Sequence, residues 1–289
     1  MQIWYFFLTL RPKQWMKNFI LFIPLVFSGN LFHENLFLVS ISGFFLFSLF
    51  SGSTYVLNDI RDKEKDQKHP TKCLRPISSG KLNPYLALVL SVVTALSVLY
   101  ITFSFFWKYI TILFLIYWIN TFIYTLWVKH IVILDVFSIA FWFVLRGLIG
   151  VFLIHTEISL WFLLLLFFGA LWFGFLKRYQ EVKLGTPTRK NILAYNEDFL
   201  KQTISMITTC IIMAYSFYTF NSVQSKWMAI TIPFVMFGMV RYFYHIFFLE
   251  KFSHSIEEII LKDWFILGDV LLFMVSVISI IYLGKIYGA

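Results

Sequence analysis

The sequence predicts an all-α polytopic membrane protein, with nine transmembrane helices in a single catalytic domain over residues 1–289. Of its 289 residues, 60% are hydrophobic and only 13% are charged, whereas an average soluble domain has about 25% charged residues. The apolar residues come in runs of about 20, the length that an α-helix needs to cross a bilayer. The short alternating strands of a membrane barrel are not visible, so helices are the expected spanning elements.

The predicted spans follow one another closely along the whole chain. We place them at about 15–31, 36–58, 84–105, 109–128, 131–154, 159–177, 202–220, 227–248 and 264–286. Little sequence remains between them, and no linker, low-complexity tract or second domain is apparent.

The loops between the spans alternate in charge. Those at 60–83 and 177–201 carry many Lys and Arg residues, and the loop at about 249–263 falls on the same side. The remaining loops are short and nearly free of positive charge. Because basic loops stay in the cytoplasm, we expect a cytoplasmic N-terminus and active site. The formal net charge of +9 then reflects membrane orientation and phosphate binding, and no nucleic-acid partner is predicted.

A dense group of acidic residues follows the second span. Its polar members are Asn58, Asp59, Asp62 and Asp66. Spacings of three and four residues place all four on one face of an α-helix. Carboxylates so close together repel one another unless a cation lies among them, and oxygen ligands completed by water and a substrate phosphate suit Mg²⁺. The alternative is a solvated helix end that pairs with Lys63 and Lys65, although acids at the end of a span tend to be functional.

This motif, NDxxDxxxD at the cytoplasmic end of the second of nine spans, resembles the UbiA-type prenyltransferase superfamily. The nine-span layout extends the resemblance over essentially the whole chain. In that family the motif holds Mg²⁺ and the diphosphate of a substrate. The resemblance therefore implies that Asp59, Asp62 and Asp66 are catalytic, and that these three residues and Asn58 are the metal ligands.

Four further stretches are similar to one bacterial branch of that family, the decaprenyl-phosphate phosphoribosyltransferases. They are Leu10 to Asn18, His69 to Ile77, Lys177 to Glu181 with Arg189, Lys190 and Tyr195, and Ile259 to Asp263. The similarity is loose from Phe252 to Glu258. Such enzymes transfer the 5-phosphoribosyl group of phosphoribosyl pyrophosphate (PRPP) to a polyprenyl phosphate. The resemblance thus implies both substrates, membrane lipids as surroundings, and the bacterial cytoplasmic membrane as location.

The stretch after the sixth span supports this branch on chemical grounds. Prenyl-transferring relatives usually carry a second Asp-rich DxxxD motif there, whereas residues 177–181 hold two cations and one Glu. Basic side chains suit an enzyme that must bind several phosphates, and Arg offers a bidentate fork. The predicted substrate-binding residues are Gln14, Lys17, Asn18, Arg61, Lys72, Arg75, Arg146, Lys177, Arg178, Glu181, Arg189, Lys190 and Tyr195. For the basic residues of the loops and for Lys17, a contact with the membrane interface is the alternative.

Some positions leave several interpretations open. Gln14, Lys17 and Asn18 are expected to share one face of the first span. Arg146 lies within the fifth span, where a charge needs a partner. The candidates are Asp135, Asn120 and the substrate.

Two residues near the last loop are also open. Asp263 either closes the site or caps the last helix. His245 is expected to be an interfacial or packing residue rather than a ligand.

The predicted reaction is a single displacement at the anomeric carbon of PRPP. Mg²⁺ on the acidic motif binds the diphosphate, and the ribose passes through an oxocarbenium-like state. The polyprenyl phosphate oxygen attacks from the opposite face with inversion, and an ionised phosphate needs no strong general base.

Two other functions are possible for this pattern. A prenyltransferase of the same fold is disfavoured by the missing DxxxD. An ion-coupled transporter would place carboxylates at the midplane or break helices in matching halves, and neither feature is found.

Overall fold

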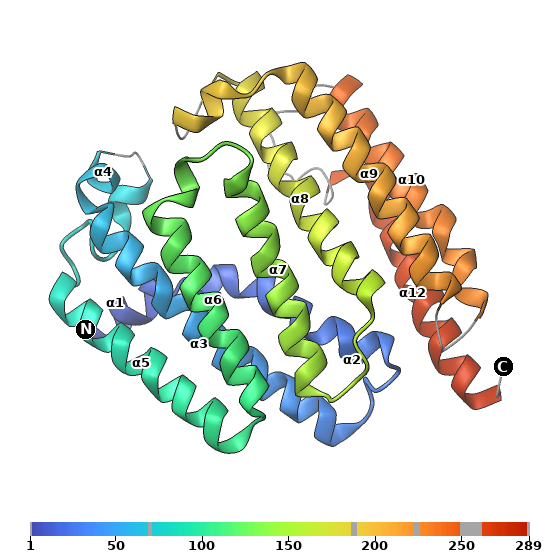
Figure 1. The fold of residues 1–289 in the computed structure, drawn as a ribbon, viewed down its shortest axis with the longest axis horizontal. Helices are drawn as coiled ribbons and strands as arrows, with labels where there is room; N and C mark the ends of the chain where they lie inside the picture. Colours follow the sequence, from blue (N-terminus) through green and yellow to red (C-terminus); the bar gives the residue numbers. More distant parts are fainter. Residues whose placement is uncertain (1, 69–70, 186–189, 222–225, 249–261, 288–289) are drawn as a thin grey trace. The chain divides into compact units, whose positions relative to one another are not determined.

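The computed structural model describes residues 2–68, 71–185, 190–221, 226–248 and 262–287 (Figure 1). This part of the chain contains helices and no β-strand. Eight of its helical segments are long and apolar enough to cross a membrane. The predicted all-α, multi-pass class is therefore confirmed. The helices form two compact units, and each is described by itself.

The long helices follow the predicted spans. They are α3 (Glu34–Arg61), α5 (Pro84–Phe105), α6 (Lys108–Leu126), α7 (Leu134–Leu153), α8 (Leu160–Lys183), α9 (Glu197–Phe220), α10 (Ile232–Phe243) and α12 (Trp264–Tyr287). The short helix η5 (Lys226–Thr231) precedes α10, and a π-helical turn, η6 (Tyr244–Phe248), follows it. Side-chain caps fix several starts: the Asn83 carboxamide oxygen accepts the Tyr85 backbone N–H at 2.8 Å, and Asn196 does the same for Asp198.

The first predicted span differs from the others. After the short helix α1 (Gln2–Thr9), residues Pro12–Phe22 form a 3₁₀-helix, η1, and only Ile23–Phe27 are α-helical, as α2. Pro24 contributes to this break, because proline donates no backbone hydrogen bond and its ring crowds the preceding turn. The span expected at 15–31 is helical, but it is not one continuous α-helix.

The first unit comprises Met1–Leu25, Asn30–Leu126 and Leu145–Glu157. Its central helix is α3, which packs against η1, α5 and α6. The short helix α4 (Lys63–Gln67) continues from the end of α3 and contacts η2 (Lys72–Leu74), as Figure 1 shows beside the α4 label. A core of buried apolar residues joins α1, α3 and the 77–87 segment. Its members are Phe6, Leu10, Val56, Ile77, Leu82 and Ala87.

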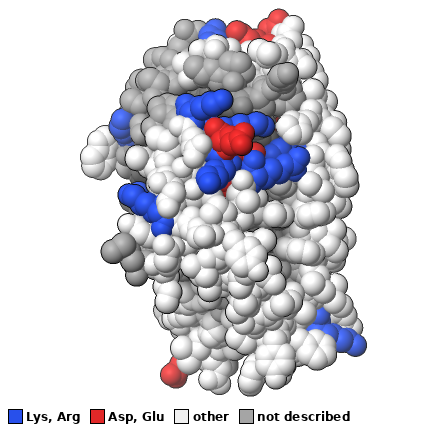
Figure 2. Space-filling model, turned by 90° about the vertical axis from the view of Figure 1, so that its left-hand side faces the viewer, with Lys and Arg blue, Asp and Glu red and all other residues white. Residues whose placement is uncertain are grey.

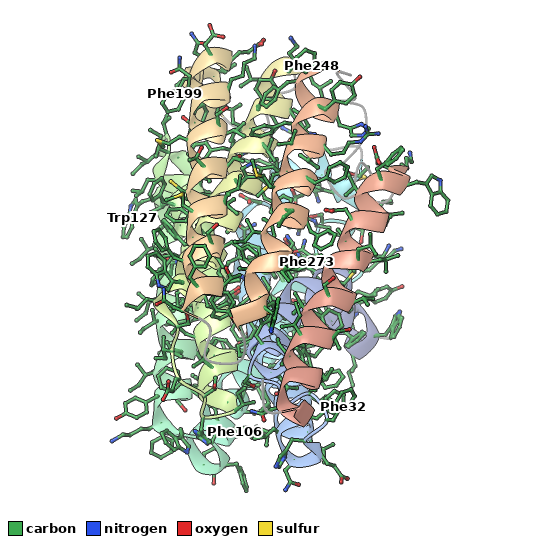
Figure 3. The ribbon with its side chains drawn as sticks, turned by 90° about the vertical axis from the view of Figure 1, so that its right-hand side faces the viewer. Phe32, Phe106, Trp127, Phe199, Phe248 and Phe273 are labelled. Atoms are coloured by element: carbon green, nitrogen blue, oxygen red, sulfur yellow. The ribbon has the colours of Figure 1, made fainter. Side chains whose placement is uncertain are left out.

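The second unit comprises Val26–Gly29, Trp127–Val144 and Ile158–Ala289. In it α8 packs on α9, α9 on α10, and α10 on α12. Figure 3 shows Phe199 and Phe248 near the same end of this group and Phe273 about halfway along α12. Phe199 and Phe248 are 42% and 79% exposed. Such apolar outer faces are typical of helices that contact lipid.

Candidate active site

The acidic motif lies where α3 ends and α4 begins. Asp62 separates the two helices and leaves helical geometry (φ −91°, ψ 7°). Helix-type backbone hydrogen bonds still run across it, because the Asp62 N–H donates to the Asn58 carbonyl at 2.9 Å and the Asp66 N–H donates to the Asp62 carbonyl at 2.8 Å. Asp59 and Asp66 become buried, whereas Asn58 and Asp62 are half-buried. The expectation of one continuous helical face therefore needs correction at Asp62. Figure 2 shows acidic side chains among Lys and Arg side chains near one end of the face drawn.

Two arginines from distant segments neutralise the buried carboxylates. Nη1 of Arg75 lies 3.0 Å from Oδ1 of Asp59 and 2.6 Å from Oδ2 of Asp66. Arg11, at the start of η1, forms a second ion pair with Oδ1 of Asp59. Arg75 was predicted to be a site residue, but Arg11 was not. Its place directly before the first span, within the Leu10 to Asn18 stretch that resembles the phosphoribosyltransferases, was the signal that could have pointed to it.

The carboxylates fit a divalent cation in one respect. A single cationic nitrogen already lies within 3.0 Å of both Asp59 and Asp66, so the two side chains are close enough to share one cation, and all the donors are oxygens. Mg²⁺ commonly binds through one or two carboxylates together with substrate phosphates. Within the described residues, no three His, Cys, Asp or Glu side chains are grouped as a complete metal site. The motif therefore fits a metal that shares its coordination with a substrate.

Of the three predicted substrate-binding residues of η1, Asn18 is separated from the other two. Asn18 and Leu21 are buried on one side of the helix, whereas Lys17 is exposed and Gln14 is half-buried. A 3₁₀-helix has three residues per turn, so Gln14 and Lys17 stay aligned, but Asn18, four residues after Gln14, does not share their face as expected.

Two other predicted residues of this unit lie beside the motif. Arg61 donates from Nη1 to the Thr125 backbone carbonyl at 3.1 Å, at the last turn of α6. Basic groups stabilise helix ends of this kind. Lys72 is half-buried at the start of η2, three residues before Arg75.

Arg146 is a buried arginine in α7 with polar contacts to other elements of the first unit. Its Nε donates to the Asn18 side-chain oxygen at 2.9 Å, and its Nη2 donates to the Tyr117 hydroxyl at 3.2 Å. The Asn18 amide in turn donates to Ser48 at 2.9 Å. The guanidinium also lies 5.6 Å from the centre of the Phe47 ring. Arg146 thus connects α7 with η1, α6 and α3, and these contacts were not among the partners that the sequence suggested.

Replacing Arg146 with Met is expected to lower the free energy of unfolding by about 1–3 kcal/mol. The Asn18 amide would lose a charged donor in a buried place, and hydrogen bonds within membranes are worth about 0.6–1.7 kcal/mol each. Thermal unfolding in detergent measures this change. The stability of Arg146→Lys should lie between those of the wild type and Arg146→Met, because one ammonium cannot reproduce both contacts. A Met variant as stable as the wild type would contradict the expectation.

Arg178 belongs to a buried ion network in the second unit. Its two Nη groups pair with Asp135 at 3.2 Å and with Glu181 at 2.8 Å, and its Nε makes no hydrogen bond within the described residues. The Tyr195 hydroxyl lies 3.5 Å from Asp135 and accepts the Ile133 backbone N–H at 2.7 Å. Burial, opposed by that N–H and reinforced by Asp135, raises the pKa of Tyr195. The phenol therefore keeps its proton, and its O–H donates a hydrogen bond to Oδ1 of Asp135.

The other predicted basic residues of this unit are Lys177, Arg189 and Lys190. Lys177 is exposed on α8. Lys190 begins η4 (Lys190–Ala194), and Arg189 lies outside the described residues.

Asp263 caps α12, as one of its two interpretations predicted. Oδ1 accepts the backbone N–H groups of Phe265 and Ile266, at 2.8 and 3.1 Å. Oδ2 pairs with Arg241 and contacts the buried side chain of His245. Burial alone would raise the pKa of Asp263, but hydrogen bonds from these groups, that of His245 first, lower it to about 2. His245 is buried and in contact with Asp263, a polar contact that the expectation of an interfacial or packing residue did not include.

The fold and the acidic motif define a membrane enzyme of the UbiA type. The model of the UbiA prenyltransferase family matches residues 19–252, and the chain therefore belongs to that family. A UbiA homolog from Archaeoglobus fulgidus bound to GPP and Mg²⁺ superimposes with a TM-score of 0.68 at 15% identity, covering 96% of this chain and 99% of that one. A digeranylgeranylglyceryl phosphate synthase gives the same TM-score at 18% identity, with the same coverage. At such identities these likenesses show the fold alone.

Curated relatives are more similar in sequence. A decaprenyl-phosphate phosphoribosyltransferase of Mycolicibacterium smegmatis is 30% identical over 277 residues, covering 88% of this chain and 85% of the relative. A protein of the same name from Corynebacterium glutamicum is 32% identical over 251 residues, covering 81% and 74%. The recognition of family and branch from the sequence is therefore confirmed.

Proposed function

We propose that the protein transfers the 5-phosphoribosyl group of PRPP to a polyprenyl phosphate of the decaprenyl type and releases diphosphate. The observation that carries this proposal is the similarity, along 81–88% of the chain, to relatives named decaprenyl-phosphate phosphoribosyltransferase. The geometry agrees with it, because paired buried carboxylates beside two arginines suit a metal-bound diphosphate. The geometry alone would fit other enzymes that use a diphosphate.

The acidic motif is the proposed diphosphate site. Asp59 and Asp66 are the two carboxylates close enough to share a cation, and Asp62 and Asn58 lie between and beside them in the sequence. When bound, Mg²⁺ would offset the charge that develops on the leaving diphosphate. Once the Arg75 guanidinium leaves the two carboxylates, it is suited to bind two oxygens of a phosphate group at the same time.

The acceptor requires little from the protein beyond binding. A polyprenyl phosphate is already ionised, so its oxygen can attack the anomeric carbon without a strong general base, and a single displacement inverts that carbon. We propose that exposed Lys177 and residues Lys72, Lys190 and Arg189 supply charge for the 5-phosphate and the acceptor phosphate. Arg178 is a weaker candidate, since both of its Nη groups already pair with buried carboxylates.

We place the protein in the bacterial cytoplasmic membrane, with the acidic motif on the cytoplasmic side. The basic loops support this orientation through the positive-inside rule. Curated relatives from bacteria support the location. PRPP is water-soluble and highly charged, so a site at the cytoplasmic face gives it direct access.

The test uses PRPP labelled in the ribose, purified protein, Mg²⁺ and decaprenyl phosphate in detergent. We expect label to enter the lipid phase and to stay in the aqueous phase when EDTA is added. A parallel reaction with labelled prenyl diphosphate and an aromatic acceptor tests the related prenyl transfer. Label moving only in the second reaction would replace phosphoribosyl transfer by prenyl transfer, and transfer undiminished by EDTA would remove the metal from the proposal.

A further inference from the structure

Arg11 has an unusual backbone conformation. Its φ of 53° and ψ of 61° lie in the left-handed region, which residues with a Cβ rarely adopt. It also precedes Pro12, and a residue before proline favours extended conformations instead. A costly conformation persists only where the surroundings hold it, and such positions gather at functional sites.

Contacts with α3 hold this joint between α1 and η1. Leu10 is 3% exposed, and its carbonyl accepts the Trp15 indole N–H at 3.0 Å. The same carbonyl packs against Gly52, where a Cβ atom would lie only 2.7 Å from the oxygen. Any larger residue at 52 would therefore push the joint away from α3. The position of Arg11 is thus held by the contacts of Leu10 with Trp15 and with Gly52.

The Arg11 side chain follows one face of α3 toward the acidic motif. Gly52, Tyr55 and Asp59 are spaced by three and four residues, so they line that face. The guanidinium carbon lies 4.4 Å from the centre of the Tyr55 ring, and the group ends at the Asp59 carboxylate. The side chain of Arg11 is only 18% exposed and that of Asp59 only 2%, so this ion pair is largely shielded from water.

Three ion pairs join Arg11, Arg75, Asp59 and Asp66, and these four side chains are together formally neutral. Asp59 and Asp66 contribute two negative charges, and Arg11 and Arg75 contribute two positive charges. Oδ1 of Asp59 is contacted by both guanidiniums. A divalent cation that takes Oδ1 of Asp59 therefore displaces both guanidiniums from that oxygen and would leave them beside it without that counter-ion.

We propose that Arg11 exchanges partners during donor binding: it leaves Asp59 for the diphosphate when Mg²⁺ and diphosphate occupy the motif together. This inference rests on the proposed function and adds a positioning residue to it. A diphosphate removes the conflict because its oxygens accept the guanidiniums that the carboxylates release. Neither ligand alone provides this exchange. Metal and diphosphate therefore bind cooperatively, and coupling between two ligands is reciprocal.

The experiment measures binding rather than turnover. Full-length protein in detergent is dialysed against labelled inorganic pyrophosphate with and without Mg²⁺, and Mn²⁺ binding alone is followed by the loss of the free-ion electron paramagnetic resonance signal. For the wild type, we expect Mg²⁺ to tighten pyrophosphate binding by about 10-fold or more, within the usual range of such coupling. For Arg11→Gln, we expect this gain to fall below about 3-fold.

The metal-only measurement tests the competition between Arg11 and the metal. Arg11→Gln frees Asp59 from one competitor, so Mn²⁺ alone should bind at least as tightly as it does to the wild type. Weaker Mn²⁺ binding would mean that Arg11 supports the acidic motif rather than competing with the metal for Asp59, and thermal unfolding of the variant in detergent checks its fold separately. Lys13→Gln is the matched control, because it removes an exposed positive charge two residues away and should behave as the wild type. Arg11→Lys should recover part of the coupling, since it restores charge without the fork.

Two results with Arg11→Gln would overturn the exchange: the variant keeps the full gain from Mg²⁺, or it binds Mn²⁺ alone more weakly than the wild type. Wild-type protein without any gain from Mg²⁺ overturns it as well. The label-transfer assay separates this failure from failure of the proposed function. Transfer without coupling removes only the role of Arg11, whereas coupling without transfer to the lipid leaves the exchange and removes the phosphoribosyl assignment.

Discussion

Asp66→Asn is expected to lower phosphoribosyl transfer by about 100- to 1,000-fold, the loss seen when one group that stabilises developing charge is removed. Asn keeps the size of the side chain but not its negative charge. Asp66 is the carboxylate that Arg75 contacts most closely, at 2.6 Å, and the same nitrogen reaches Asp59. The variant therefore loses one of the two carboxylates that share one cationic nitrogen in the structure. The rate of label transfer from PRPP into lipid measures the loss.

Glu64→Gln provides the matched control for this result. Glu64 lies two residues earlier in the same short helix α4, but it is exposed. It should keep most of the wild-type rate. A similar loss in both variants would mean that the overall negative charge of α4 matters, and not the position of Asp66. Thermal unfolding of the Asp66 variant must be compared in parallel, because Arg75 loses an ion-pair partner in it.

The sequence predicted the elements of this fold well because each depends on local properties. A run of about 20 apolar residues can satisfy its backbone in lipid only as a helix, and the eight helical segments of the described residues that are long and apolar enough to cross a membrane follow from this. The spacing of the acidic motif likewise predicted that its residues would gather at the end of α3. The first span was the exception, because the choice between 3₁₀ and α geometry around Pro24 depends on packing against α3.

The partners of the buried charges could not be predicted in the same way. Residue spacing shows which side chains share one helix face, but not which helices meet. Arg11 and Asp59 are 48 residues apart, and their contact depends on the close packing of Leu10 against Gly52. A glycine within an apolar span gives no indication of what it approaches. The basic residues after the sixth span were equally ambiguous. They suggested phosphate ligands, whereas Arg178 of that stretch forms buried ion pairs with Asp135 and Glu181.

Arg178→Met is expected to destabilise the protein by about 3–5 kcal/mol, the usual result of removing one partner from a buried ion pair. Asp135 is 0% exposed and Glu181 is 8% exposed, and Arg178 contacts both. Without its guanidinium, two carboxylates remain buried close together. Chemical or thermal unfolding in detergent measures the change. Lys177→Met should have little effect, because that neighbouring side chain is exposed.

A second set of variants separates the structural role of Arg178 from phosphate binding. Combining Arg178→Met with Asp135→Asn and Glu181→Gln removes the whole charge network, and much of the lost stability should return because neutral groups of similar size tolerate burial. If Arg178 acts mainly on phosphate, the single variant will instead unfold like the wild type and lose transfer. The stability of Arg178→Met therefore separates two roles for the basic stretch after the sixth span. If the variant is as stable as the wild type, both Lys177 and Arg178 bind substrate. If it is destabilised, Lys177 binds substrate and Arg178 stabilises the packing of α8.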